Sequence, residues 1–269
     1  MANTTKLKVG FIGTGNIART GHLNHLAHWD DVELVAFCDI DQQAAARAVS
    51  AYGGTAYTSA ERLFDEVALD AVYVCLPPFA HSNQELLAAE RGVALFVEKP
   101  LGVDLDTAAA INAAVEKSGI VSAVGYNWRS AAITPLARER MAGKEVSAAF
   151  AYWIGSFPGA MWWRQQAQSA GQMNEQATHA IDIARHLIGG KAVSVYAQGA
   201  KGIGAKKWER HDICDHIIAT ITFANGAVLC AGTGHLAPGR FRIGVDFLLD
   251  ELAISHNNDE LIVKTPGCE

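Results

Sequence analysis

A glycine-rich loop lies directly after the first apolar run of the chain, and it constrains the fold more than any other feature. The run 8–12 leads into Gly13-Thr14-Gly15-Asn16-Ile17-Ala18, a G-x-G-x-x-A pattern at the start of an expected helix. The first glycine permits a tight turn, the second lets backbone approach a pyrophosphate, and the small last residue lets helix and strand pack closely. Free N–H groups at the helix start would face the phosphates. The pattern predicts a dinucleotide-binding βα unit.

A carboxylate follows the second apolar run. Asp39 comes directly after the run 32–38 and lies 21 residues beyond Ala18, where it can accept hydrogen bonds from the adenosine ribose hydroxyls. Asp41 is close by, and no Lys or Arg comes just after it, so a 2′-phosphate would be repelled. We therefore expect NAD as the cofactor, in preference to NADP.

The first 125 residues alternate short apolar runs with longer segments of helical periodicity. The runs are nearly all apolar, as expected of strands that helices cover on both faces. The longer segments carry apolar residues three and four positions apart, often between a capping Asp or Ser and a Gly. We expect strands at 8–12, 32–38, 71–76, 94–97 and 120–125, and helices at 41–52, 59–66, 80–91 and 104–118. This order predicts a doubly wound parallel sheet, an α/β Rossmann domain of residues 1–125.

Alternating runs dominate after residue 125. They lie at 147–154, 193–199, 216–223, 227–232 and 241–249, and one continuous helix is expected at 175–188. Asn225-Gly226 between two runs is a hairpin signal, because both residues tolerate positive φ. Residues 126–269 are therefore expected to form an α+β domain with a largely antiparallel open sheet. The boundary predicts a tight hinge with the active site in the crevice.

Composition excludes several classes of protein. The 269 residues carry a formal net charge of −6 without a stripe of Lys or Arg, so nucleic acid is not an expected partner. No apolar stretch reaches the roughly 18 residues of a bilayer-spanning helix and no secretory signal begins the chain, so we expect a cytoplasmic protein without a membrane partner. His22, His25 and His28 recur at helical spacing without a carboxylate or thiol among them, and the five cysteines form no C-x-x-C pair. We expect no metal site.

Three further segments carry a family resemblance. They are 70–81, with Leu76-Pro77-Pro78 and His81, then 95–101, with Glu98-Lys99-Pro100, and finally 171–182, which reads E-Q-x-T-H-x-x-D from Glu175 to Asp182. From Leu7 to about Val263 the chain resembles the glucose-fructose oxidoreductase / inositol dehydrogenase / MocA family. The resemblance implies hydride transfer between nicotinamide and a secondary alcohol carbon of a sugar, inositol or glycoside.

The resemblance also implies roles for individual residues. Oxidising an alcohol requires a base beside its hydroxyl, and His179 has a suitable ordinary pKa. Lys99, just past the end of a strand, can hydrogen-bond the substrate hydroxyl and stabilise developing alkoxide. Glu175 precedes His179 by four residues, so one continuous helix would place both on one face. The family commonly has Asp where this chain has Glu175, which leaves open whether Glu175 contacts substrate or tunes Lys99 and His179.

Two further sets of residues complete the expected site. Trp162 is expected to stack on a sugar face or to lie in the core, His81 to contact cofactor or to brace its loop, and Asp182 to brace the catalytic helix. The expected substrate-binding residues are Lys99, Arg129, Trp162, Glu175 and His179. The expected cofactor-binding residues are Gly13, Thr14, Gly15, Asn16, Ile17, Asp39, Leu76, Pro77, His81, Glu98, Lys99 and Asn127.

Family chains usually continue for several dozen residues past the point where this one stops, so we expect a second domain shortened at its C-terminus. Apolar residues occupy both parities of the runs at 217–223 and 241–249, and the family's open sheet commonly packs against another subunit. A homo-oligomer, dimer or tetramer, is expected, in which the second domain supplies both the substrate site and the subunit interface. Two alternatives to the dehydrogenase stay open: a glycosidase or epimerase that retains NAD and oxidises its substrate transiently, and a dinucleotide-binding sensor without catalysis.

Overall fold

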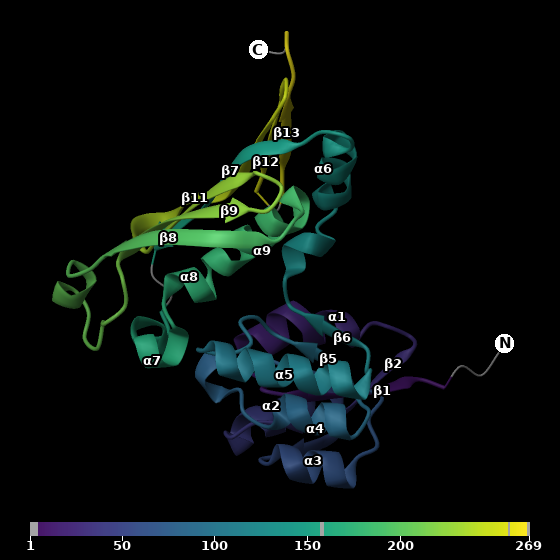
Figure 1. The fold of residues 1–269 in the computed structure, drawn as a ribbon. Helices are drawn as coiled ribbons and strands as arrows, with labels where there is room; N and C mark the ends of the chain where they lie inside the picture. Colours follow the sequence, from purple (N-terminus) through teal and green to yellow (C-terminus); the bar gives the residue numbers. More distant parts are fainter. Residues whose placement is uncertain (1–4, 157–158, 258, 268–269) are drawn as a thin grey trace. The chain divides into compact units, whose positions relative to one another are not determined.

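The computed structural model describes residues 5–156, 159–257 and 259–267. By internal contacts the chain divides into two compact units, Met1–Gly125 and Tyr126–Glu269 (Figure 1). Among the described residues, no helix is long and apolar enough to cross a membrane.

The first unit is built on a six-stranded sheet in which every paired strand is parallel. Its order is β3-β2-β1-β4-β5-β6, and this is a doubly wound parallel sheet, the architecture predicted from the sequence. The strands are β1 (Leu7–Ile12), β2 (Val32–Cys38), β3 (Thr55–Tyr57), β4 (Ala71–Val74), β5 (Ala94–Val97) and β6 (Ser122–Val124). The sequence analysis missed β3, because three residues are too few to show a periodicity.

Helices connect these strands, and side-chain caps fix where several of them begin. The carboxylates of Asp41 and Asp104 and the hydroxyl of Ser59 accept hydrogen bonds from backbone N–H groups in the first turns of α2, α3 and α5, as predicted. The helical segments are η1 (Ala18–Leu23, a π-helical turn), α1 (Asn24–Leu26), α2 (Gln42–Tyr52), α3 (Ala60–Glu66), η2 (Pro78–Ala80), α4 (Gln84–Glu90) and α5 (Leu105–Ser118).

Two apolar clusters fill this unit, one on each face of the sheet. Alternate residues of a strand enter different clusters: Phe11 packs with Leu23 and Phe37, while Ile12 belongs with Leu63 and Leu95. Burial on both faces explains why these strands are nearly continuous apolar runs.

The second unit contains a seven-stranded sheet of order β13-β12-β11-β7-β10-β9-β8. All its pairs are antiparallel except β7 with β10, which agrees with the expected open, largely antiparallel sheet. Gly226, with φ of 90°, turns the predicted β9–β10 hairpin. The strands are β7 (Val146–Ser156), β8 (Ala192–Ala200), β9 (His216–Phe223), β10 (Val228–Gly234), β11 (Leu236–Leu249), β12 (Leu252–His256) and β13 (Leu261–Lys264).

Short helices accompany this sheet: η3 (Asn127–Ser130), α6 (Ile133–Met141), η4 (Met161–Arg164), α7 (Gln166–Ser169), α8 (Gln172–Glu175), α9 (Ala177–Ile188) and η5 (Gly204–Lys206). The buried side of α9 packs on β7, β10 and β11, and its Ala180 and Ala184 belong to one apolar cluster with Ala149 and Leu229. Small side chains at this contact allow close approach of helix and sheet.

The prediction of one continuous helix at 175–188 is wrong. Gln176, at φ −111° and ψ −51°, separates α8 from α9. Glu175 therefore ends one helix while His179 lies in the next. The sequence spacing of four residues does not by itself place their side chains on a common helical face.

Candidate active site

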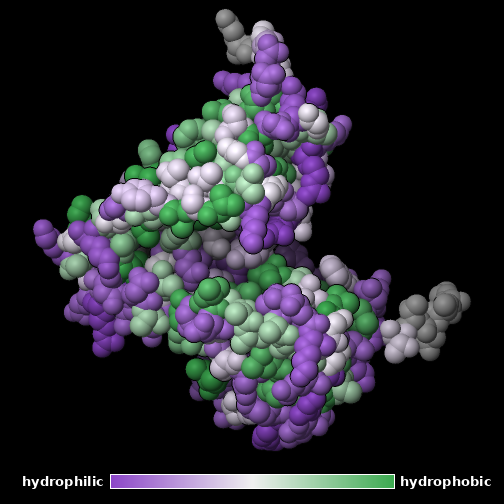
Figure 2. All heavy atoms as spheres, viewed as in Figure 1, coloured by the Kyte–Doolittle hydropathy of each residue, from purple (hydrophilic) through white to green (hydrophobic). Residues whose placement is uncertain are grey.

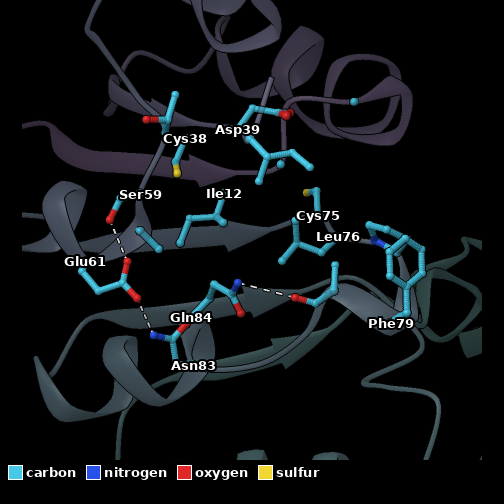
Figure 3. A pocket seen from close by; sticks show the side chains of 17 residues that line it. Ile12, Cys38, Asp39, Ser59, Glu61, Cys75, Leu76, Phe79, Asn83 and Gln84 are labelled. Atoms are coloured by element: carbon cyan, nitrogen blue, oxygen red, sulfur yellow. Dashed lines mark hydrogen bonds between the residues drawn. The ribbon is translucent and has the colours of Figure 1, made fainter. Parts of the chain in front are cut away.

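A cavity of about 420 Å³ opens in the first unit beside the carboxyl ends of β1, β2, β3 and β4 (Figure 3). Its position is the edge of an open α/β sheet where ligands bind, near the point at which the strand order reverses between β1 and β4. Five of the predicted cofactor-binding residues line it: Gly13, Gly15, Asp39, Leu76 and Pro77.

The two loop glycines do different things. Gly13 has φ of 86°, its N–H donates to the Cys38 carbonyl at 2.8 Å, and a Cβ there would collide with the backbone of Cys75. A Cβ on Gly15 would meet no atom within 4 Å. Gly13 is thus required by the protein's own packing, whereas Gly15 leaves open space from which a pyrophosphate can approach the backbone.

Asp39 is held at the mouth of this loop. One carboxylate oxygen accepts from Thr14, from the backbone N–H at 2.9 Å and from the hydroxyl at 3.0 Å. The other accepts from the N–H of Asp41 at 3.0 Å. A carboxylate fixed in this way beside the glycine loop fits the recognition of ribose hydroxyls by an adenine dinucleotide.

A second carboxylate, Glu61, lines the same cavity. It accepts hydrogen bonds from the Ser59 hydroxyl at 2.7 Å and from the Asn83 amide at 2.5 Å (Figure 3). These bonds lower the pKa of Glu61 to about 2, so it stays ionised at neutral pH. The charged residues lining the cavity are therefore both acidic, Asp39 and Glu61.

Sequence reasoning missed the part of the cavity that follows β3 and β4. Residues 58–61 follow β3 and extend into the first turn of α3, and Phe79, Ala80, Asn83 and Gln84 follow β4, from η2 to the start of α4. Had the sequence analysis predicted the strand Thr55–Tyr57, it would have indicated residues 58–61, because residues just past the carboxyl end of a parallel strand lie at the sheet edge where ligands bind. The residues after β4 were missed because the sequence analysis expected a helix from residue 80, whereas α4 begins only at Gln84 and a loop precedes it.

Other predicted cofactor residues lie outside the lining of this cavity. Glu98 accepts from the backbone N–H of Lys99 at 3.1 Å, and its other oxygen lies 2.7 Å from Nε2 of His22. His81 is buried, with Nδ1 2.5 Å from the carboxylate of Glu85, which braces the turn before α4. Asn16, Ile17 and Asn127 are exposed.

In the second unit, His179 stands among aromatic rings. Its imidazole stacks at 5.7 Å from the ring of Trp153 and at 6.2 Å from that of Trp128, and Tyr126 meets it edge-on at 6.3 Å. The histidine is half-buried. The indoles of Trp128 and Trp153 also stack on each other at 5.8 Å, so they form one aromatic cluster with the imidazole that restrains the plane of its ring.

Arg129 and Asp182 form a two-point ion pair. Nε of Arg129 donates to Oδ2 of Asp182 at 2.7 Å, and the terminal guanidinium nitrogen donates to Oδ1. Asp182 lies on α9 and is buried, so the pair ties η3 to that helix. This contact agrees with the bracing role expected of Asp182. Elsewhere in the unit Glu175 is buried, and Trp162 packs against Trp163 with ring centroids 5.3 Å apart.

A parallel sheet in this strand order, with the glycine loop after β1 and a fixed carboxylate after β2, defines a Rossmann-type dinucleotide-binding protein. The chain belongs to the GFO/IDH/MocA oxidoreductase family. The model of that family's NAD-binding Rossmann fold matches residues 7–126, and the model of its C-terminal domain matches residues 142–249. The expected family, fold class and NAD-dependent oxidoreductase character are confirmed.

Individual relatives agree with this assignment. The chain is 28% identical to D-glucoside 3-dehydrogenase of Escherichia coli and 28% identical to levoglucosan dehydrogenase of Pseudarthrobacter phenanthrenivorans. These matches cover 84% and 87% of this chain and 69% of each relative. The chain thus spans about two thirds of these curated relatives, and its match to Bacillus subtilis glucose-6-phosphate 3-dehydrogenase covers 53% of that protein.

Solved structures show the same fold. A levoglucosan dehydrogenase in complex with NADH and levoglucosan superposes with a TM-score of 0.86 at 26% identity, covering 98% of this chain and 78% of that one. The WlbA dehydrogenase of Bordetella pertussis, in complex with NADH and UDP-GlcNAcA, also gives 0.86, at 21% identity over 98% of this chain and 79% of that one.

Proposed function

We propose that this protein uses NAD to oxidise a secondary alcohol of a sugar, an inositol or a glycoside. The observation that carries the proposal is the cavity beside the glycine loop. Open space surrounds Gly15 there, and hydrogen bonds hold the carboxylate of Asp39 in place. The relatives named dehydrogenases of a glucoside and of levoglucosan support the substrate class.

In this proposal the first unit, residues 1–125, holds the cofactor. The backbone at Gly13 and Gly15 receives the pyrophosphate, and Asp39 accepts from the adenosine ribose. Leu76 and Pro77 supply apolar contact from the turn after β4. When bound, NAD⁺ supplies the hydride acceptor. Two carboxylates at the cavity, Asp39 and Glu61, disfavour a 2′-phosphate and therefore favour NAD over NADP.

The second unit, residues 126–269, supplies substrate contacts and a base. We assign to His179 the removal of the hydroxyl proton, because aromatic contacts restrain its ring and imidazole is the side chain that most often acts as a general base. To Lys99, in the first unit, we assign a hydrogen bond to a substrate hydroxyl and the stabilisation of charge that develops on that oxygen. Trp162 offers an aromatic face to a sugar ring. Arg129 acts mainly through Asp182, as a brace of α9.

The test is a substrate screen with the purified protein. NAD⁺ is supplied with a panel of sugars, glycosides and inositols, and the absorbance of NADH is followed. We expect net NADH with at least one compound. Turnover without net NADH would instead identify an internal redox cycle, as in the glycosidase or epimerase alternative. Tight NAD binding without any turnover over the panel would favour the sensor.

We also propose that the protein forms a homo-oligomer through the outer face of the second sheet. Across β8, β9, β10 and β7, one row of paired residues runs through Tyr196, Thr220, Cys230 and Phe150. Tyr196 and Phe150 are exposed, as is Ile218 in the next row. Figure 2 shows hydrophobic residues, in green, exposed among polar ones over this unit. A second copy of the same face would cover them.

A further inference from the structure

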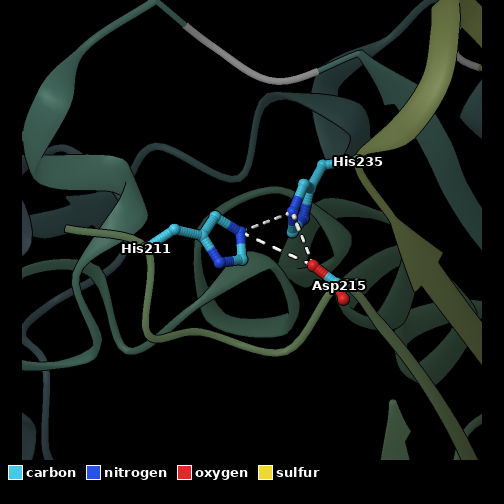
Figure 4. A group of neighbouring side chains, drawn as sticks. All are labelled: His211, Asp215 and His235. Carbon is cyan, nitrogen blue, oxygen red and sulfur yellow. Dashed lines mark hydrogen bonds and ion pairs between the residues drawn. The ribbon is translucent and has the colours of Figure 1, made fainter. Parts of the chain in front are cut away.

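Three buried side chains with metal-ligating atoms meet in the second unit, away from the aromatic rings around His179. His211 and Asp215 come from the segment that leads into β9, and His235 from the junction of β10 with β11 (Figure 4). Their side chains are between 0% and 2% exposed. The proposed dehydrogenase chemistry uses none of them.

Their three ligand atoms face a common point. Nε2 of His211 and Nε2 of His235 lie 2.9 Å apart, and each lies 3.7 Å from Oδ1 of Asp215. The point equidistant from the corners of this triangle is about 2.0 Å from each atom, which is the length of Zn–N and Zn–O bonds in proteins. The separations of the three atoms therefore suit one shared ion.

The carboxylate is already held in position by the backbone. Its Oδ1 accepts from the N–H of Gly204 and its Oδ2 from the N–H of Ile203, both at 2.8 Å. Such outer contacts orient a metal ligand. Gly204 also keeps the cluster open, because a Cβ at this position would collide with the imidazole of His211 and with Oδ1 of Asp215.

The charges at the cluster suit a cation. Within the described part of the chain, both ion-pair partners of Asp215 are histidines, His211 and His235. A neutral imidazole is the form that ligates metal, and a buried carboxylate is stabilised when it binds a cation.

We propose that His211, Asp215 and His235 bind one divalent transition-metal ion, with Zn²⁺ as the best match to two imidazoles and one carboxylate. A tetrahedral Zn²⁺ takes four ligands, so the ion would need one ligand, such as water, beyond these three buried side chains. It would tie the segment before β9 to the β10–β11 junction. This differs from the absence of metal expected from the sequence. The competing arrangement is a hydrogen bond between the two rings, with Asp215 satisfied by backbone alone.

The experiment uses the full chain, stripped with a chelator and titrated with ZnCl₂ by calorimetry. We expect about one Zn²⁺ per chain. Saturation should raise Tm by about 5 °C or more, the size expected when an ion that binds the folded state alone is present at 100 times its Kd. Asp215→Asn and His235→Gln should weaken binding by more than the roughly 10–100-fold that loss of an outer contact costs.

His256→Gln is the matched control, because His256 is also a buried histidine of this unit and lies outside the cluster. It should keep the Zn²⁺ stoichiometry. If a ligand variant fails to fold, Co²⁺ added to the unmodified protein gives a second readout, since visible ligand-field bands that Zn²⁺ abolishes report an enclosed site. A folded protein that takes up neither ion would overturn the proposal, as would equal binding by Asp215→Asn and His256→Gln.

Discussion

The carboxylate of Asp39 accepts two hydrogen bonds from Thr14, one from the backbone N–H at 2.9 Å and one from the hydroxyl at 3.0 Å. This pair joins the end of β2 to the glycine loop after β1. It fixes a negative charge where an adenosine ribose would bind, and it therefore bears on which dinucleotide the protein accepts.

Asp39→Ala should weaken NAD binding by roughly 10- to 100-fold, the usual worth of a hydrogen bond to a charged group. NADP binding should change less, because the same substitution also removes a repulsive charge. Calorimetry with both dinucleotides measures the two effects. Asp41→Ala, which removes the neighbouring carboxylate, is the control. An unmodified protein that binds NADP as tightly as NAD would contradict the assignment.

The two loop glycines should respond differently to the same substitution. Gly13→Ala meets the backbone of Cys75 at a positive φ, so it should lower Tm, with backbone strain alone costing about 1–3 kcal/mol. Gly15→Ala meets no protein atom and should leave Tm unchanged while weakening NAD about tenfold or more. Thermal denaturation without NAD and calorimetry with it separate the effects. Unaltered NAD affinity in Gly15→Ala would show that the pyrophosphate binds elsewhere.

Lys99→Ala and His179→Ala should each lower turnover by about 100-fold or more, the size of a positioned acid–base contribution. NAD affinity should stay within a few-fold of the unmodified protein, because the proposed roles concern the substrate hydroxyl. Single-turnover kinetics measure the chemical step directly. Near-normal turnover in either variant, under conditions where chemistry limits the rate, would remove that residue from the proposed mechanism.

The buried ring of His256 should make the protein less stable in acid. The Thr134 hydroxyl donates to the Trp128 carbonyl at 2.6 Å, so Nε2 of His256, 2.9 Å from that hydroxyl, is the donor of their hydrogen bond. Burial lowers the pKa of His256 below 6.5. As pH falls, the histidine therefore takes up a proton in the unfolded chain before it does so in the folded protein, which favours unfolding. The contribution of neutral His256 to stability is complete above about pH 6.5 and is lost at lower pH, by at most about 1.4 kcal/mol per pH unit.

His256→Gln tests this effect, since the amide can replace the donor without titrating. The fall in Tm between pH 7 and pH 5 should be smaller in the variant than in the unmodified protein. An equal fall in both proteins would assign the acid sensitivity to other groups.

The outer face of the second sheet should mediate self-association. Phe150→Glu and Ile218→Glu place charges among its exposed apolar residues and should shift the protein toward monomer at micromolar concentration. Light scattering measures the change. Leu105→Glu, at an exposed apolar position of the first unit, should leave the mass unaltered. A monomeric, fully active unmodified protein would refute the interface, which should bury upwards of about 1,000 Å².

Local sequence patterns were sufficient for the first unit. A strand buried on both faces must be apolar throughout, and helix caps use few residue types, so β2 and β5 begin and end where predicted, and α2, α3 and α5 begin directly after the predicted capping residues. The motif G-x-G-x-x-A identified the loop of the cavity for a similar reason, since the positive φ of Gly13 and its close approach to Cys75 require glycine there.

Tertiary structure decided the rest, because those features depend on which distant segments meet. Glu61 and Asn83 reach the cavity only because β3 and β4 end at the same edge of the sheet. Spacing along one helix indicated neither the break at Gln176 nor the pairing of Arg129 with Asp182, which joins two segments 53 positions apart. His211, Asp215 and His235 are separated by up to 24 positions without a local motif, and only the pairing of β9 with β10 brings them together.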